Sequence, residues 1–199
     1  MFKFVLPLMV MASLLAAAEI KPIVPKRVID AMTLGAFAKL GDQAVPISIG
    51  LSGITAPTSK EAPEAAEISR RALYNILATG RRDGQLFPVV LEMTGDRFGR
   101  DDRGRILAIV SFPPPRAIHE ISMDEPRLII RPVSMVQQET IQEYMVRNGW
   151  AVLEAEAILP ASLKERLVAL QKTASNANIG LWKDYRTAME LASQKRPLP

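Results

Sequence analysis

Residues 96–110 read DRFGRDDRGRILAIV and decide how the centre of this chain is organised. The stretch places two copies of an Asp-x-x-Gly-Arg pattern directly before an apolar run typical of a β-strand. A turn of this kind brings a carboxylate and a guanidinium together, and a fixed guanidinium can hold a phosphate by paired hydrogen bonds. The pattern therefore suggests phosphodiester chemistry, provided that the rest of the chain supplies metal ligands and a general base.

The first residues predict export. Lys3 precedes the apolar run FVLPLMVMASLLAAA, which ends in small residues at 16–18, where a signal peptidase cleaves. We expect residues 1–18 to be a signal peptide and the protein to be periplasmic or secreted. The alternative is an uncleaved N-terminal anchor, which would be the chain's only contact with a membrane.

Composition limits the remaining classes of function. The chain has 199 residues, no Cys and one His, His119, so a lipoprotein and a Cys/His zinc site are both excluded. Its 25 Lys and Arg against 21 Asp and Glu give a net charge of +4, a mild excess that permits an anionic partner without requiring one. After the signal, the length fits one domain.

Turn residues divide the chain into elements. Residues 19–26 contain two prolines and predict an extended leader. Strands are predicted by apolar runs at 27–40, 44–54, 87–93 and 105–112. The first two runs are broken at Gly35, Gly41 and 50–53. Pro63 and apolar residues at helical spacing up to Leu77 predict a helix that ends at Gly80. Ser134 with Gln137, and Ser162 with Glu165, form capping-box patterns that predict two more helices.

The remaining segments are a Pro-rich insertion at 112–132 and a polar, loosely held C-terminal tail at 183–199. Five or so strands, with one helix after the early strands and two at the end, predict an α+β fold with a mainly β core. The architecture that fits this order is a five-stranded OB-type Greek-key barrel with about three helices, formed by residues 27–182.

Five short motifs follow one another along this domain: VIDAMTL at 28–34, GITAPT at 53–58, DDRGRILA at 101–108, EYMVRNGWAVL at 143–153 and NIGLW at 178–182. In this order they resemble motifs of the staphylococcal nuclease (thermonuclease) family, such as Val-x-Asp-Gly-Asp-Thr-Leu, Gly-Ile-Asp-Ala-Pro-Glu and Asp-x-Tyr-Gly-Arg-x-Leu-Ala. DRFGR at 96–100 resembles the last of these equally well in isolation. The two tryptophans, Trp150 and Trp182, lie in motifs that predict core packing rather than base stacking.

The resemblance implies a site that this sequence has largely lost. Enzymes of the family hydrolyse DNA and RNA with one Ca²⁺, two metal-binding aspartates, a glutamate that handles water and two arginines. The matching positions of the aspartates hold Met32 and Thr55, that of the glutamate holds Thr58, and that of one arginine holds Gly50. Asp30 is retained and is a weak candidate for a metal ligand.

The second arginine is the one catalytic group that the resemblance retains. It corresponds to Arg105 if the pattern next to the strand is in register, or to Arg100 if the first copy is. A thioether and a neutral hydroxyl are poor replacements for calcium-binding carboxylates, and each lost catalytic contact costs on the order of 10²-fold in rate. We therefore expect no cofactor and a catalytically inactive domain.

Three functions remain under consideration. The first is a binding or structural module of the cell envelope that uses the insertion to hold a protein partner. The second is a secreted nuclease with altered calcium ligation, in which Asp101 or Glu61 has taken a new role. The third is a metal-free binder of single-stranded nucleic acid, and for any such anionic or protein partner the candidate contact residues are Arg97, Arg100 and Arg103.

Overall fold

The computed structural model describes residues 23–40, 42–78, 85–94, 100–112 and 139–194. The predicted signal peptide, most of the Pro-rich insertion, Asp96, Arg97, His119 and the capping pattern at Ser134 and Gln137 lie outside these ranges. Within the described ranges, no helix is long and apolar enough to cross a bilayer.

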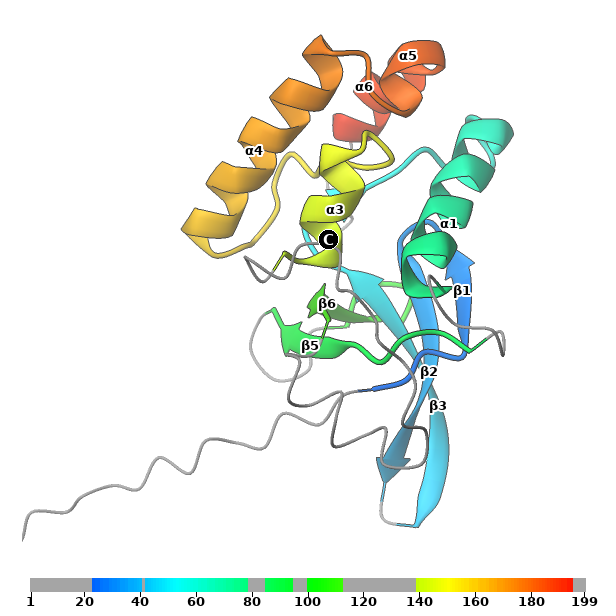
Figure 1. Cartoon of the computed structure of the whole chain (residues 1–199). Coiled ribbons are helices and arrows are strands. Elements are labelled where there is room, and N and C mark those ends of the chain that lie inside the picture. The colour runs from blue at the N-terminus through cyan, green and yellow to red at the C-terminus, as the bar shows by residue number, and fades with distance from the viewer. Residues whose placement is uncertain (1–22, 41, 79–84, 95–99, 113–138, 195–199) are drawn as a thin grey trace, which may run out of the picture.

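A mixed five-stranded sheet forms the centre of the fold (Figure 1). Its spatial order is β1 (Arg27–Asp30), β2 (Thr33–Leu40), β3 (Gln43–Leu51), β6 (Ile106–Ser111) and β5 (Val90–Met93). All neighbours are antiparallel except β3 and β6, which are parallel. A second, two-stranded sheet pairs β4 (Ile54–Thr55) with β7 (Val152–Leu153).

The two outer strands of the larger sheet are linked by the segments that precede them. Ile23 and Val89 exchange two backbone hydrogen bonds of 2.8 Å, just before β1 and β5 respectively. The sheet therefore curls back on itself, as strands of an OB-type fold do. This arrangement of sheet and helices confirms the predicted α+β class.

Gly35 and Gly50 lie inside β2 and β3 rather than at breaks between strands, which corrects the sequence expectation. Both positions need a small residue because other side chains cross the sheet there. A Cβ on Gly35 would lie 3.1 Å from Cγ of Arg27, and one on Gly50 would lie 3.0 Å from Cδ2 of Leu107. In these strands glycine marks a close approach and not a turn.

Five helices are described: α1 (Pro63–Ala78), α3 (Ile141–Arg147), α4 (Ala161–Asn176), α5 (Leu181–Asp184) and α6 (Arg186–Ser193). Figure 1 shows the helices gathered at one end of the sheet, with the β2–β3 hairpin projecting from the other. The helix predicted after Pro63 is confirmed as α1.

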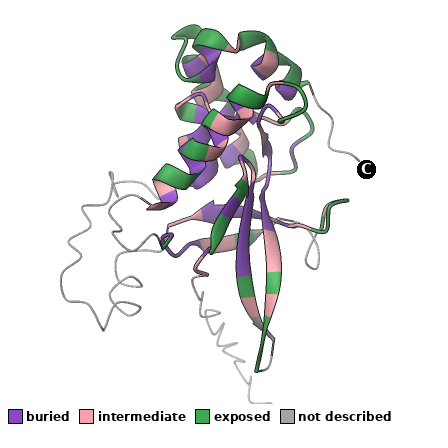
Figure 2. Cartoon of the chain, turned by 90° about the vertical axis from the view of Figure 1, so that its right-hand side faces the viewer, coloured by how far each residue is buried: buried purple, intermediate pink, exposed green. Residues whose placement is uncertain are grey.

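The main core lies between the sheet and the helices (Figure 2). Leu34 and Ile49 from the sheet, Leu73 from α1, and Met145 from α3 are fully buried in it. Gln142 is also fully buried: its amide nitrogen donates to the Ala108 carbonyl at 2.8 Å, and its amide oxygen accepts from Val110 N at 3.1 Å. This side chain holds α3 against β6 and leaves its own polar atoms satisfied.

The starts of α3 and α4 use different chemistry. Thr140 and Glu143 form a reciprocal capping box at the start of α3. At α4 the predicted cap, Ser162, is wrong: the helix begins at Ala161 after Pro160 and has no side-chain cap. Because the Pro160 carbonyl already accepts from the amides of Leu163 and Lys164, both at 3.0 Å, Ser162 lies within the first turn.

The predicted loose tail is also wrong for residues 183–193. These residues complete α5 and form α6, and Met189 and Ala192 of α6 are fully buried in a second apolar cluster with Trp182. Trp182 is buried, as its motif predicted, and the partly buried Trp150 packs against both clusters. The last helix is therefore part of the folded domain.

Candidate functional site

Arg105 lies at the start of β6 and is held from two sides. Its Nε donates to Oδ2 of Asp101 at 2.6 Å, its Nη2 lies 2.6 Å from the same oxygen, and its Nη1 donates to the Thr33 hydroxyl at 2.8 Å. The other Asp101 oxygen accepts from the Arg105 amide at 2.9 Å. A single carboxylate thus fixes both the backbone and the guanidinium of Arg105.

Local sequence explains this geometry. Gly104 has a φ of +72°, which is favourable only for glycine, and its amide donates to the Asp101 carbonyl at 2.9 Å. The resulting turn folds Asp101 back onto Arg105. On the sheet side, an added Cβ at Gly50 would stand 3.4 Å from Nε of Arg105, so the missing side chain leaves room for the guanidinium. We refer to Arg105, Asp101, Thr33 and Gly50 as the arginine cluster.

The arginine cluster is largely shielded from water. The side chains of Arg105 and Asp101 are 19% and 14% exposed, and Thr33 is buried. Burial raises the pKa of Asp101. The hydrogen bonds from the Arg105 amide and guanidinium lower it by a larger amount in total, so the pKa of Asp101 is below its ordinary value. The ion pair is therefore intact at neutral pH.

Glu154, which follows β7, adds a second negative charge near Arg105. Burial raises the pKa of Glu154, and the charge of Arg105 lowers it only in part. The guanidinium is thus paired with Asp101 and lies within electrostatic range of Glu154. Sequence reasoning missed Thr33 and Glu154. Thr33 lies within the VIDAMTL motif and could have been noticed there, whereas nothing near Glu154 in the sequence signals its proximity to Arg105.

Of the other predicted arginines, Arg97 lies outside the described residues, and Arg100 and Arg103 lie on the surface. Arg100 is exposed and its Nη1 donates to the Gly104 carbonyl at 2.7 Å, and Arg103 is exposed beside it. Arg105, and not Arg100, is the arginine beside β2 and β3. This placement follows from the pairing of Ile106 with Ile49 in the parallel part of the sheet.

The donors at the family's calcium positions do not fit that ion. Oδ1 of Asp30 accepts from the Met32 amide at 2.8 Å, and the Met32 side chain packs against the core. Thr58 donates its hydroxyl to Glu61 at 2.8 Å, so this acid is engaged in its own turn. Thr55 supplies a neutral hydroxyl where a carboxylate is needed. Across the described ranges no three His, Cys, Asp or Glu side chains gather as a metal site would require.

Comparison with protein families identifies the domain. A sequence model of the staphylococcal nuclease homologue family matches residues 48–184, which include the end of β3, the turn from Asp101 to Arg105, α3 and α5. The chain belongs to this family. Membership indicates a nuclease-related or nucleic-acid-binding function at the coarsest level. A search of curated proteins found no match.

Proposed function

We propose that this member of the staphylococcal nuclease family is catalytically inactive and serves as a protein-binding module of the cell envelope. The observation that carries the proposal is the internal ion pair of Arg105. A guanidinium that donates to Asp101 and Thr33 has few donors left for a phosphate. A phosphodiester that paired with the Nε side of the guanidinium would have to displace Asp101 and leave that carboxylate largely buried without its partner, which is strongly unfavourable.

The chemistry of the replaced residues supports the same conclusion. Met32 and Thr55 stand where the family resemblance implies calcium-binding carboxylates, and Thr58 stands where it implies the residue that activates water. Loss of a general base and of charge stabilisation each costs on the order of 10²-fold or more in rate. Because such groups act as a unit, one remaining arginine does not restore the rate.

The binding role is proposed from the segments that the domain adds. The export signal predicted at 1–18 would bring the domain to the envelope, and the Pro-rich sequence at 112–132 predicts a long loop of the kind that often carries recognition. Deleting 113–127 is expected to leave the melting temperature unchanged and to abolish capture of the partner from envelope extracts. Capture that survives the deletion would contradict this assignment. Lys172→Ala, an exposed change on α4 outside the insertion, is the control and should leave capture unchanged.

A second candidate function, binding of single-stranded nucleic acid, is favoured by the exposed side chains of Arg100 and Arg103. Two neighbouring cations in the segment before β6 can contact phosphates without a metal. If this function holds, a fluorescent oligo-dT will bind with an affinity that falls as salt rises, and Arg100→Ala/Arg103→Ala will weaken the binding and flatten the salt dependence. Our main proposal predicts no saturable binding of this probe.

A further inference from the structure

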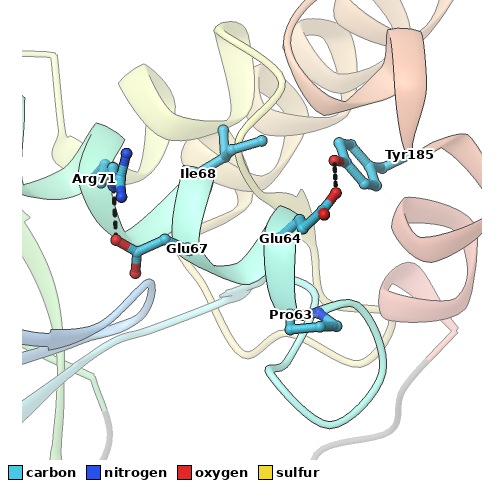
Figure 3. Close-up of a pocket in the computed structure, with 6 residues that line it drawn as sticks. All are labelled: Pro63, Glu64, Glu67, Ile68, Arg71 and Tyr185. Carbon is cyan, nitrogen blue, oxygen red and sulfur yellow. Dashed lines mark hydrogen bonds and ion pairs between the residues drawn. The ribbon is translucent and has the colours of Figure 1, made fainter.

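A groove of about 470 Å³ lies between α1 and the junction of α5 with α6 (Figure 3). Its lining residues are Pro63, Glu64, Glu67, Ile68, Arg71 and Tyr185. Figure 3 shows Glu64 and Tyr185 at one end and Glu67 with Arg71 at the other, with Ile68 between them. We call this the α1 groove. It shares no residue with the arginine cluster.

The Tyr185 ring is held in a defined place. Its amide donates to the Leu181 carbonyl at 2.8 Å, and its carbonyl accepts from the Met189 amide at 3.1 Å. Leu181 and Met189 are both buried in the second apolar cluster, against which Tyr185 packs. Its phenol donates to Oε2 of Glu64 at 2.7 Å, so the α5–α6 junction and α1 meet at this bond. The groove is therefore preformed.

The two ends of the groove differ in charge. Glu67 binds both Arg70 and Arg71 at 2.7 Å, and these hydrogen bonds lower its pKa to about 2. That end therefore has no free carboxylate and carries a net positive charge from the two arginines. Glu64 has a neutral phenol as its partner and no paired cation in the described part of the chain. Asp184 adds a further negative charge close enough to raise the pKa of Tyr185, after the larger effects of the Glu64 hydrogen bond and burial.

Apolar surface lies beside this uncompensated charge. Ile68 is 40% exposed although it belongs to a helix whose other face is buried, and Pro63 is exposed at the helix start. An arginine side chain matches such a surface, because its stem covers apolar atoms while its guanidinium binds a carboxylate and stacks on an aromatic ring. A free inorganic cation would leave Ile68 uncovered, and an anion would meet Glu64.

We propose that the α1 groove docks a basic segment of a partner protein, with an arginine side chain on Glu64 and Tyr185 and an apolar neighbour on Ile68. The inference rests on the proposed function in that it takes the domain to be a protein-binding module. It adds a surface and a partner chemistry that neither the insertion nor the family supplies.

The test uses the folded mature domain and a defined probe, the peptide Ac-Ala-Leu-Arg-Leu-Ala-NH2, titrated into ¹⁵N-labelled protein. We expect saturable amide shifts confined to residues 64–71 and 184–186. Replacing arginine by citrulline, which keeps the shape and removes the charge, should weaken binding at least about fivefold, the equivalent of roughly 1 kcal/mol. Glu64→Gln should weaken it to the same extent, and Ile68→Ser should weaken it independently of charge.

The matched control is Glu165→Gln, which removes one exposed acid from α4 and should leave peptide binding unchanged. Three results would overturn the inference. The citrulline peptide could bind as tightly as the arginine peptide, the amide shifts could lie outside the groove, or a peptide with glutamate in place of arginine could bind more tightly. If the groove fails and deletion of 113–127 still abolishes partner capture, the proposed function stands without it. If the domain cleaves nucleic acid, the proposed function fails whatever the peptide does.

Discussion

Within the described residues, the arginine cluster and the Glu64 end of the α1 groove differ in whether the acidic side chain is paired with a cation of the same chain. At the cluster, a guanidinium that is 19% exposed is bound to an acid that is 14% exposed, and Glu154 adds a second negative charge nearby. At the groove, the exposed Glu64 carboxylate has a neutral phenol for a partner. The charges of the arginine cluster are therefore paired with one another inside the domain, whereas the charge of Glu64 in the groove remains available to another molecule.

The largest expected effect comes from breaking the ion pair of the cluster. Asp101→Ala leaves Arg105 largely buried without its carboxylate, and we expect a loss of about 3 kcal/mol in the free energy of unfolding. Urea denaturation followed by circular dichroism measures this loss. Asp102→Ala, an exposed neighbour, is the control and should change stability by no more than about 0.5 kcal/mol. Equal effects of the two variants would mean that Asp101 does not hold Arg105 in place.

The pH dependence of the same pair gives the second prediction. The pKa of Asp101 is lowered in the folded state from its ordinary value of 3.8. Its ionised form therefore stabilises the protein above about pH 3.8, and this stability is lost as the pH falls through the lower, folded-state pKa. The gap in melting temperature between the natural protein and Asp101→Asn should narrow steadily below pH 4. A gap that stays constant down to pH 2 would contradict the assignment.

Glu154 provides a smaller and opposite effect. Because its pKa is raised in the folded state, its charged form is unfavourable at pH 7, and Glu154→Gln should raise the free energy of unfolding by less than about 1 kcal/mol. Thermal denaturation at pH 7 and pH 4 measures this, and the gain should disappear at the lower pH as the natural carboxyl takes up its proton. A loss as large as that of Asp101→Ala would make Glu154 a structural partner of Arg105.

The smallest effect concerns the groove. The hydrogen bond to Glu64 raises the pKa of the Tyr185 phenol above its ordinary 10.0. Glu64→Gln should move this pKa back towards 10.0 without a change in fold. Carbon-13 NMR of the tyrosine Cζ resonances, with Tyr144 as an internal reference, measures it directly. An unchanged titration of Tyr185 would show that its phenol is not bound to Glu64 in solution.

The sequence predicted the parts of this fold that local patterns specify. Pro63 and the apolar spacing that follows predict α1, and four apolar runs predict the main strands. Local patterns also misled. Ser162 and Glu165 have the spacing of a capping box, but the helix is capped at Pro160, two residues earlier, where the backbone carbonyl accepts the first helical hydrogen bonds. From the sequence alone, Gly35 and Gly50 are interpreted as strand breaks. Their actual role depends on the neighbouring side chains of Arg27 and Leu107, which come from other strands and cannot be seen in the local sequence.

The sequence from α5 to α6 contains a helical pattern of apolar residues that its polar neighbours obscured. Trp182, Tyr185, Met189 and Ala192 recur at helical spacing, and the structure places all four in or against one apolar cluster. Their polar neighbours made residues 183–199 resemble a solvated tail. Because that prediction removed α6 from the domain, it also removed Tyr185 and hence the α1 groove.

The choice between Arg100 and Arg105 shows what the sequence does not contain. Both arginines end the same five-residue pattern, and although only Arg105 directly precedes the apolar run ILAIV, that adjacency does not show which side chain reaches the neighbouring strands. The bond from Arg105 to Thr33 joins positions 72 residues apart, and it depends on how β6 pairs with β3. The pairing of Asp101 with Arg105 likewise depends on the folded turn and cannot be deduced from the pattern alone.

The measurement that tests our central claim most directly is hydrolysis of single-stranded DNA and RNA by the purified mature domain. It is made with Ca²⁺, Mg²⁺, Mn²⁺ or EDTA, beside an Arg100→Ala/Arg105→Ala variant whose fold is checked by circular dichroism. We predict no cleavage above the protein-free control under any of these conditions. Metal-dependent cleavage that the double variant loses would contradict the claim, because it would mean that other ligands have replaced the missing aspartates.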